Sequence, residues 1–225
     1  MPLPRLPLQP WTEGAPTAPP GDGAVLWLEP RPPPPAVASF VAPLRDALGP
    51  RRWSPQLRTV PLAGPPPGRN PWAHRQDRQQ PLRWGPGDGD EGAVELADVV
   101  EERAPLDGLV LVGACVGRTD QELRTLLRQV VPLLRPEAPW LAIEPNGRAL
   151  QQIARNLATA DTERGEGRGT VRSVEELRRL LETGGLGLAG AWALPAGRRR
   201  DRLARSLLGA DATAEWMIVR GRAIR

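Results

Sequence analysis

The chain has 225 residues, 40% of them hydrophobic, which fits one globular domain with extensions. Its formal net charge is +4 at pH 7, yet its isoelectric point is about 10.9, because all 30 basic residues are arginine, which stays protonated. No apolar run of about eighteen residues is present, which argues against a membrane span. The single cysteine excludes an internal disulfide framework and a cysteine-based zinc site.

The arginine content is weak evidence for a nucleic-acid partner. Arginine, proline, alanine and glycine are abundant together, whereas lysine and tyrosine are absent, a bias typical of a GC-rich genome. We therefore expect a solvated arginine surface and no nucleic-acid or membrane partner. The first residues, MPLPRLPLQPW, lack the apolar core of a secretion signal, so a cytoplasmic location is expected.

The N-terminal part of the chain is rich in proline. Residues 1–23 are predicted to form a flexible arm, and residues 24–225 the folded domain. A strand is expected over residues 24–29, followed by RPPPP, which must be extended. Apolar residues at helical spacing predict a helix over residues 37–48, which Pro43 should kink or shorten and Gly49 should end.

The next stretch carries weaker signals. Residues 57–62 predict a short or edge strand, residues 81–84 another short strand, and residues 94–103 a helix. The segments between them are turn-rich. His74, the only histidine, has no partner at catalytic spacing, so we interpret it as an ordinary loop residue.

Residues 106–146 read as strand, helix, strand. The run LDGLVLVG suits a strand buried on both faces of a parallel sheet, and WLAIEPN suits a second one. Between them, Thr119 and Glu122 have capping-box spacing at the start of an amphipathic helix that Pro136 stops. We predict that residues 109–112 and 141–143 are adjacent, central, parallel strands.

The C-terminal third continues with helices and two strands. Residues 149–158 predict a helix, and Ser173 with Glu176 forms a second capping box. Residues 186–194 and 215–219 are apolar runs that we expect to pair antiparallel at one sheet edge. The arginine-rich segment 198–205 between them is interpreted as a solvated link.

From about residue 106 onward, LLRPEAPWLAIEPN and SVEELRRLLETGGL stand in the order and at the spacing used by one family. This half resembles class I S-adenosylmethionine-dependent methyltransferases of the type 11-like group. The resemblance implies an α/β, Rossmann-like class I methyltransferase sandwich. Its sheet would be mostly parallel and seven-stranded, with an antiparallel C-terminal strand pair. Glu137 and Ala138 depart from the pattern, because they replace two glycines of the family's turn.

The first half departs more strongly from that family. Where the family has a glycine-rich loop after its first strand, this chain has VLWLEPRPPPPAV, without glycine and with four prolines that lack amide donors. Glu29 occupies roughly the place of the family's first acidic residue, and no acidic residue ends segment 57–62. If a pocket for S-adenosylmethionine survives, the resemblance places Glu29, Gly113 and Ala114 beside it, where strand order reverses.

Three functions stay open on this basis. The first is an active methyltransferase of unknown substrate, a small molecule or a protein, with an unusual cofactor loop. The second is a homologue that has lost catalysis and acts through protein contacts. The third, nucleic-acid binding through the arginine surface, is not favoured. Cys115 lies at the ligand-binding edge of such a sheet, but we interpret it as a small buried hydrophobic residue. No metal site is expected.

Overall fold

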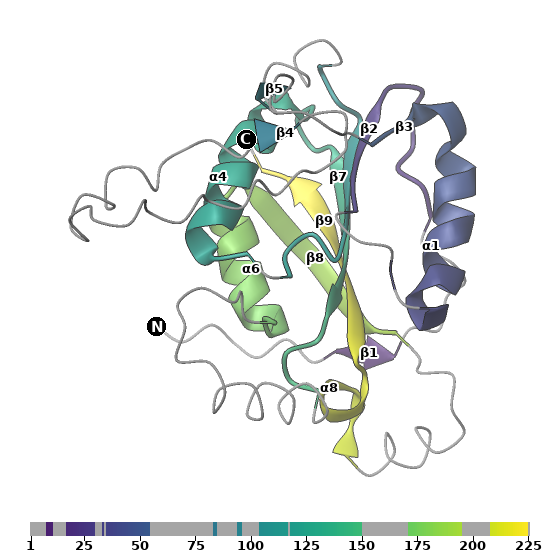
Figure 1. Ribbon diagram of the computed structural model, residues 1–225, viewed down its shortest axis with the longest axis vertical. Helices are drawn as coiled ribbons and strands as arrows, with labels where there is room; N and C mark the ends of the chain where they lie inside the picture. Colours follow the sequence, from purple (N-terminus) through teal and green to yellow (C-terminus); the bar gives the residue numbers. More distant parts are fainter. Residues whose placement is uncertain are drawn as a thin grey trace, which may run out of the picture.

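A computed structural model describes residues 8–10, 17–29, 33, 35–54, 83–84, 94–95, 104–116, 118–149, 171–194 and 208–224. The described residues form three layers, with a central β-sheet between helices (Figure 1). The strands of this sheet are β1 (Gln9–Pro10), β2 (Val25–Leu28), β3 (Arg52–Trp53), β6 (Gly108–Val112), β7 (Pro139–Pro145), β8 (Leu186–Ala193) and β9 (Trp216–Ala223). The helices are α1 (Pro35–Leu48), α4 (Asp120–Val130), α6 (Val174–Thr183) and the short α8 (Ala210–Thr213), with 3-10 turns η1 (Gly49–Arg51) and η3 (Val131–Leu133).

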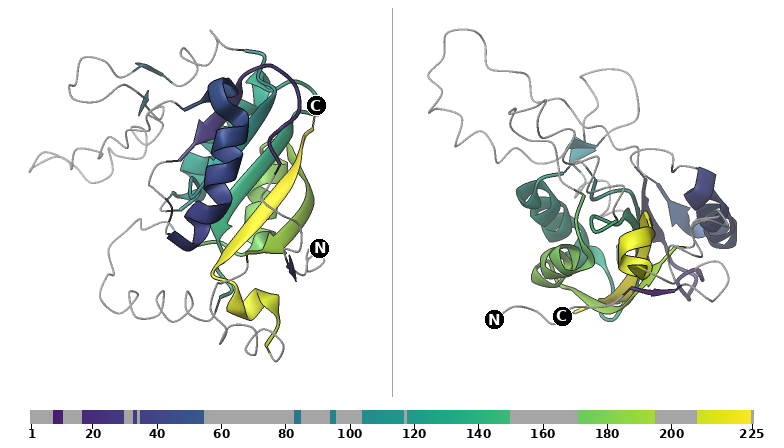
Figure 2. Two further views of the ribbon diagram at one scale, coloured as in Figure 1. Left: turned by 90° about the vertical axis from the view of Figure 1, so that its right-hand side faces the viewer. Right: turned by 90° about the horizontal axis from the view of Figure 1, so that it is seen from below.

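The sheet is mostly parallel and has the order β1-β8-β9-β7-β6-β2-β3. Only β9 is reversed, and it pairs antiparallel with both β7 and β8. Helix α1 covers one face, and α4 and α6 cover the other, as the view from below shows (Figure 2). This order and the reversed β9 confirm the predicted Rossmann-like α/β class with its antiparallel closing pair.

The central unit agrees with the sequence. Strands β6 and β7 are adjacent and parallel, with Leu109 opposite Trp140 and Val112 opposite Ile143. All five residues of β6 are buried, as a strand covered on both faces requires. Both predicted capping boxes are formed, since Thr119 precedes α4 and Ser173 precedes α6, each with reciprocal bonds to the Glu three residues later.

The edge of the sheet differs from the expectation. Strands β8 and β9 do pair antiparallel, but β8 is not the last strand. Gln9–Pro10, from the segment predicted to be a flexible arm, forms β1 and pairs parallel with Trp192 and Ala193 of β8. The neighbouring Leu8 is buried in the core, so apolar burial holds part of this proline-rich segment against the sheet.

Two local predictions need correction. Helix α1 runs from Pro35 to Leu48 and includes Pro43, so Pro43 does not shorten it, and Pro35, expected to be extended with RPPPP, is its first residue. Gly49 follows the helix with a positive φ of 49°, as the predicted stop requires. The helix predicted from residue 94 is wrong at its start, because β5 (Val94–Glu95) pairs antiparallel with β4 (Arg83–Trp84) in a separate two-stranded sheet. Cross-strand pairing there overrides helix propensity.

Several predictions lie outside the described residues: the strand over residues 57–62, the helix over residues 149–158 apart from its first residue, the link over residues 198–205, and the position of His74.

Two apolar cores flank the sheet. One lies between the sheet and α4 and α6, and the other between the sheet and α1. Side chains of β6 alternate between them, with Leu109 and Leu111 in the first and Val110 and Val112 in the second. This double burial fixes the strands and so positions the loops at their carboxyl ends.

Candidate functional site

Strands β2 and β6 are neighbours from which the strand order of the sheet continues in opposite directions. From β2 the order continues to β3 on one side, and from β6 it continues to β7 on the other. Ligands of open α/β sheets bind in the crevice outside the carboxyl ends of strands at such a point. Glu29 directly follows β2, and Gly113 and Ala114 directly follow β6, which pairs with β2. The three predicted site residues therefore lie at neighbouring strand ends.

The carboxylate of Glu29 is occupied by contacts within the protein. Arg45 of α1 donates from Nη2 to both of its oxygens, at 2.9 and 2.7 Å. The indole Nε1 of Trp27 donates to Oε2 at 2.7 Å. The guanidinium groups of Arg45 and Arg52 lie over the Trp27 ring, 5.7 and 5.9 Å from its centre. Glu29 thus belongs to a charged cluster between β2, β3 and α1.

Gly113 and Ala114 begin the turn out of β6. Gly113 has a φ of 59°, a left-handed conformation that favours glycine, and its amide donates to Ile143 O at 2.9 Å. A Cβ at Gly113 would meet no atom within 4 Å. Ala114 is fully buried, so it contributes packing and backbone groups to this turn.

A second polar site lies beside the first, at the carboxyl ends of β6 and β7. Glu144 of β7 is only 2% exposed, and its Oε1 accepts from the Cys115 amide at 3.1 Å. Its Oε2 has no hydrogen-bond partner among the described residues. A cavity of about 10 Å³ adjoins it, lined by Cys115, Val116, Glu144, Pro145, Arg172 and Met217 among others.

Burial dominates the electrostatics of this cavity. It raises the pKa of Glu144 to about 7, although the Cys115 amide and the charge of Arg172 act in the opposite direction. Burial also raises the pKa of the Cys115 thiol well above its usual value, and the Glu144 carboxylate adds to that rise. The pKa of Arg118 is lowered from its usual value, again by burial. Cys115 is therefore a protonated, buried thiol, as its sequence interpretation expects.

Arg172, just before α6, holds the segment between β6 and α4. This segment, residues 113–119, is called the post-β6 loop below. Arg172 donates from Nη1 to Cys115 O at 2.9 Å and from Nη2 to Arg118 O at 2.7 Å. It also donates from Nη2 to Asp120 Oδ1 at 2.8 Å. A planar guanidinium can serve these separate acceptors at once, as a lysine ammonium cannot.

Sequence reasoning missed Glu144 and Arg172 as site residues. A signal for Glu144 was present, because a carboxylate inside a buried apolar strand must have partners or a shifted pKa. No comparable signal marked Arg172 among 30 arginines. Its importance follows from contacts with residues more than fifty positions away.

A larger hollow of about 480 Å³ lies between α4 and α6. Its lining carries charges of both signs, including Asp120, Arg124, Glu176 and Arg179. Neither this hollow nor the small cavity is lined by Glu29, Gly113 or Ala114. In the described part of the chain, no three His, Cys, Asp or Glu side chains gather closely enough to hold a metal ion. Within the same residues, no helix has the length and apolar character needed to cross a membrane.

No family model and no curated protein matches the chain. Solved structures do resemble its backbone. The mitomycin 7-O-methyltransferase is 19% identical with a TM-score of 0.46, and the match covers 89% of this chain and 49% of that one. The methyltransferase CalO6 is 18% identical with a TM-score of 0.47, covering 88% and 56%. A magnesium protoporphyrin IX methyltransferase from Synechocystis is 10% identical with a TM-score of 0.46, covering 89% and 73%.

The chain thus spans about half the length of the first two of these proteins. Similarity at this level does not identify an activity, a cofactor or a substrate for this chain.

Proposed function

We propose that this chain is a methyltransferase-like protein in which S-adenosylmethionine binding is weakened or lost. The sheet order, the reversed β9 and the two capped helices support the methyltransferase-like part. The main observation for weakened cofactor binding is that the Glu29 carboxylate already accepts hydrogen bonds from Arg45 and Trp27. A carboxylate neutralised within the protein is not available to a ligand.

The other residues at the strand ends do not fit the cofactor either. The four prolines of RPPPP have no amide hydrogens to donate, and the last of them, Pro35, is the first residue of α1. Gly113 keeps a backbone that a ligand could approach closely, but it is the only glycine of the three candidate residues. We therefore assign no methyl-transfer step to this site.

Two rival functions make different predictions. An active methyltransferase needs S-adenosylmethionine at low-micromolar affinity, whereas a protein that acts through contacts with another protein does not. The charged cluster around Glu29 favours the protein that acts through contacts with another protein. A nucleic-acid role rests on the arginine content alone and is not proposed.

Calorimetric titration with S-adenosylmethionine and S-adenosylhomocysteine tests the proposal. Loss of two hydrogen-bonding features, at about 1–3 kcal/mol each, weakens a micromolar ligand to roughly millimolar affinity, so we expect little or no heat. Low-micromolar binding would overturn the proposed loss and favour the active methyltransferase. In that case Gly113→Trp is the matched variant, because its side chain would enter the crevice, and unchanged affinity would place the site elsewhere.

A further inference from the structure

We infer that Glu144 is a pH-operated latch on the post-β6 loop: its ionised carboxylate holds backbone amides of the loop, and protonation loosens them while the fold stays intact. The latch needs no cofactor. It concerns the loop that contains two of the candidate site residues, Gly113 and Ala114. It would therefore control the shape of the crevice whatever ligand that crevice takes.

The loop is held through its backbone from two sides. On the amide side, Cys115 donates to Glu144 Oε1 at 3.1 Å, and the Ala114 amide also favours the charged carboxylate. On the carbonyl side, Arg172 binds the carbonyls of Cys115 and Arg118. Glu144 itself is fixed, because it lies within β7, paired with Met217 of β9. The rigid strand β7 thus holds the Glu144 carboxylate in place, and the post-β6 loop depends on that carboxylate for its hydrogen bonds.

The two sides respond differently to pH. Guanidinium groups keep their charge throughout the physiological range, so the carbonyl side is constant. A carboxylate loses its charge on protonation, and a hydrogen bond to a charged acceptor is roughly twice as strong as one to a neutral acceptor. The amide side therefore weakens when Glu144 takes up a proton.

The structure leaves room for that proton. Glu144 Oε2 has no partner among the described residues, and Glu144 lines a cavity of about 10 Å³. That volume holds about one water molecule. Val116, at the rim, is 38% exposed, so the cavity lies near solvent. The proton can enter and leave at Oε2 without displacement of β7.

Among the described residues, the other charged groups near the cavity have partners or neighbours of their own. From the loop, the Cys115 thiol has its pKa raised further from neutrality, and Arg118 remains a cation. From α4, Asp120 binds Arg172, and Glu122 lies in its capping box and near Arg118. From α6 and β9, the cavity receives Leu177 and Met217, which are apolar. Of the described groups near the cavity, Glu144 is the one whose pKa is raised to about 7.

The latch has a signature that a merely structural carboxylate lacks. Deprotonation strengthens the loop's hydrogen bonds but places a charge in the interior, which lowers global stability. Local protection of the Cys115 amide and the global free energy of unfolding must therefore change in opposite directions as pH rises. An amide that only follows global unfolding would change with it, not against it.

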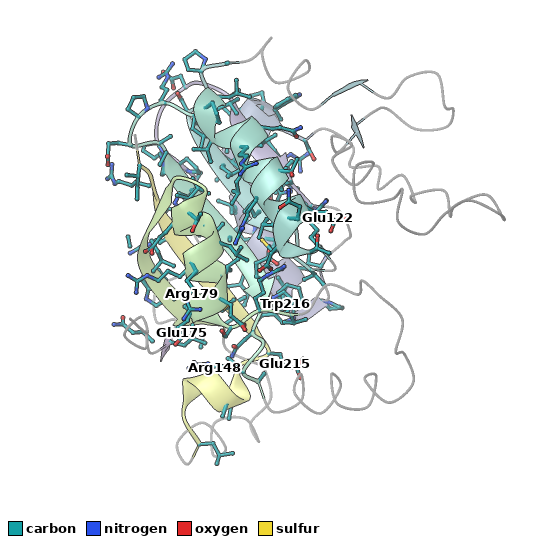
Figure 3. All side chains as sticks on the ribbon, turned by 90° about the vertical axis from the view of Figure 1, so that its left-hand side faces the viewer. Glu122, Arg148, Glu175, Arg179, Glu215 and Trp216 are labelled. Atoms are coloured by element: carbon teal, nitrogen blue, oxygen red, sulfur yellow. The ribbon has the colours of Figure 1, made fainter. Side chains whose placement is uncertain are left out.

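Amide hydrogen exchange by NMR tests this on the full chain, at about pH 6 and pH 8, after correction for the intrinsic exchange rate. We expect the Cys115 amide to be protected roughly tenfold more at pH 8 in the wild type. Glu144→Gln should remove that difference. Glu175→Gln is the matched control, because Glu175 is also buried but ion-pairs with Arg148 at 3.2 Å; both residues are labelled in Figure 3.

Equal protection at both pH values in the wild type overturns the latch, and so does an undiminished difference in Glu144→Gln. If Glu144→Gln fails to fold, the protection of the Cys115 amide in the wild type at the two pH values tests the latch by itself. With ¹³C-labelled glutamate, the Glu144 carboxyl carbon and the Cys115 amide must titrate with one common midpoint. Different midpoints overturn the latch.

Discussion

Arg45 binds both carboxylate oxygens of Glu29 through one nitrogen, Nη2, at 2.9 and 2.7 Å. The contact joins the residue directly after β2 to the last turn of α1, and the Arg45 guanidinium lies over the ring of Trp27. It converts the acidic residue at the expected ligand edge into part of the β2–α1 interface. The proposed weakening of S-adenosylmethionine binding depends mainly on this pair.

A double-mutant cycle on this pair measures its contribution. The Arg45 side chain is 38% exposed and that of Glu29 is 13% exposed, so solvent screens the pair only in part. We expect a coupling free energy of about 1 kcal/mol between Glu29→Gln and Arg45→Met, determined by urea unfolding of the four proteins. Additive effects of the two substitutions would mean that Glu29 is free for another partner.

The pH dependence of stability follows from Glu144. Its folded-state pKa of about 7 lies above its unfolded value near 4.5, so the folded protein binds the extra proton between these values. The contribution of this group to the free energy of unfolding is therefore largest at low pH and is lost as pH rises through 7. The loss is about 3 kcal/mol.

Urea unfolding between about pH 5 and pH 8 checks this, with Glu144→Gln beside the wild type. Glutamine cannot ionise, so the free energy of unfolding of Glu144→Gln should change less with pH than that of the wild type. The difference should equal the contribution of Glu144. Parallel curves for the two proteins would show that Glu144 titrates normally in the folded state.

Gly113 is required for its backbone conformation rather than for space. Its φ is 59°, while an added Cβ would meet nothing within 4 Å. We expect Gly113→Ala to destabilise the fold by about 1 kcal/mol, and Gly113→Asn by less, because asparagine tolerates the left-handed region better. Thermal or urea unfolding distinguishes the two. Equal losses in both variants would point to a steric cause instead.

Among the arginines of the described site, Arg172 should be the one whose substitution lowers the free energy of unfolding most. Arg172→Met leaves the buried carbonyls of Cys115 and Arg118 without their donor, at an expected cost of about 3 kcal/mol. Arg172→Lys should recover only part of this, because an ammonium cannot reproduce the fork of contacts. The measurement is the urea midpoint of unfolding.

The control for this prediction is Arg179→Met on the exposed face of α6 (Figure 3). A surface substitution of this kind is expected to change stability by about 0.5 kcal/mol or less. Similar losses for Arg172 and Arg179 would show that the buried contacts of Arg172 carry no special weight.

Several features of this protein depend on local pattern and could be predicted along the chain. Continuous apolar runs predicted β6 and β7, and capping boxes at Thr119 and Ser173 predicted where α4 and α6 begin. These signals act within a few residues, through hydrogen-bond geometry and the burial of one face, so they can be read along the chain. The fold class followed from their order.

The partners of the charged residues depend on tertiary packing and could not be predicted from local pattern. Glu29 is held by a residue 16 positions away, Glu144 receives an amide 29 positions away, and Arg172 binds a carbonyl 57 positions away. Likewise, Gln9–Pro10 becomes a strand only because the edge of β8 and a buried place for Leu8 are available to it. Burial and ion pairing are properties of the packed neighbourhood. They set the pKa of Glu144 and the availability of Glu29, and no local pattern contains them.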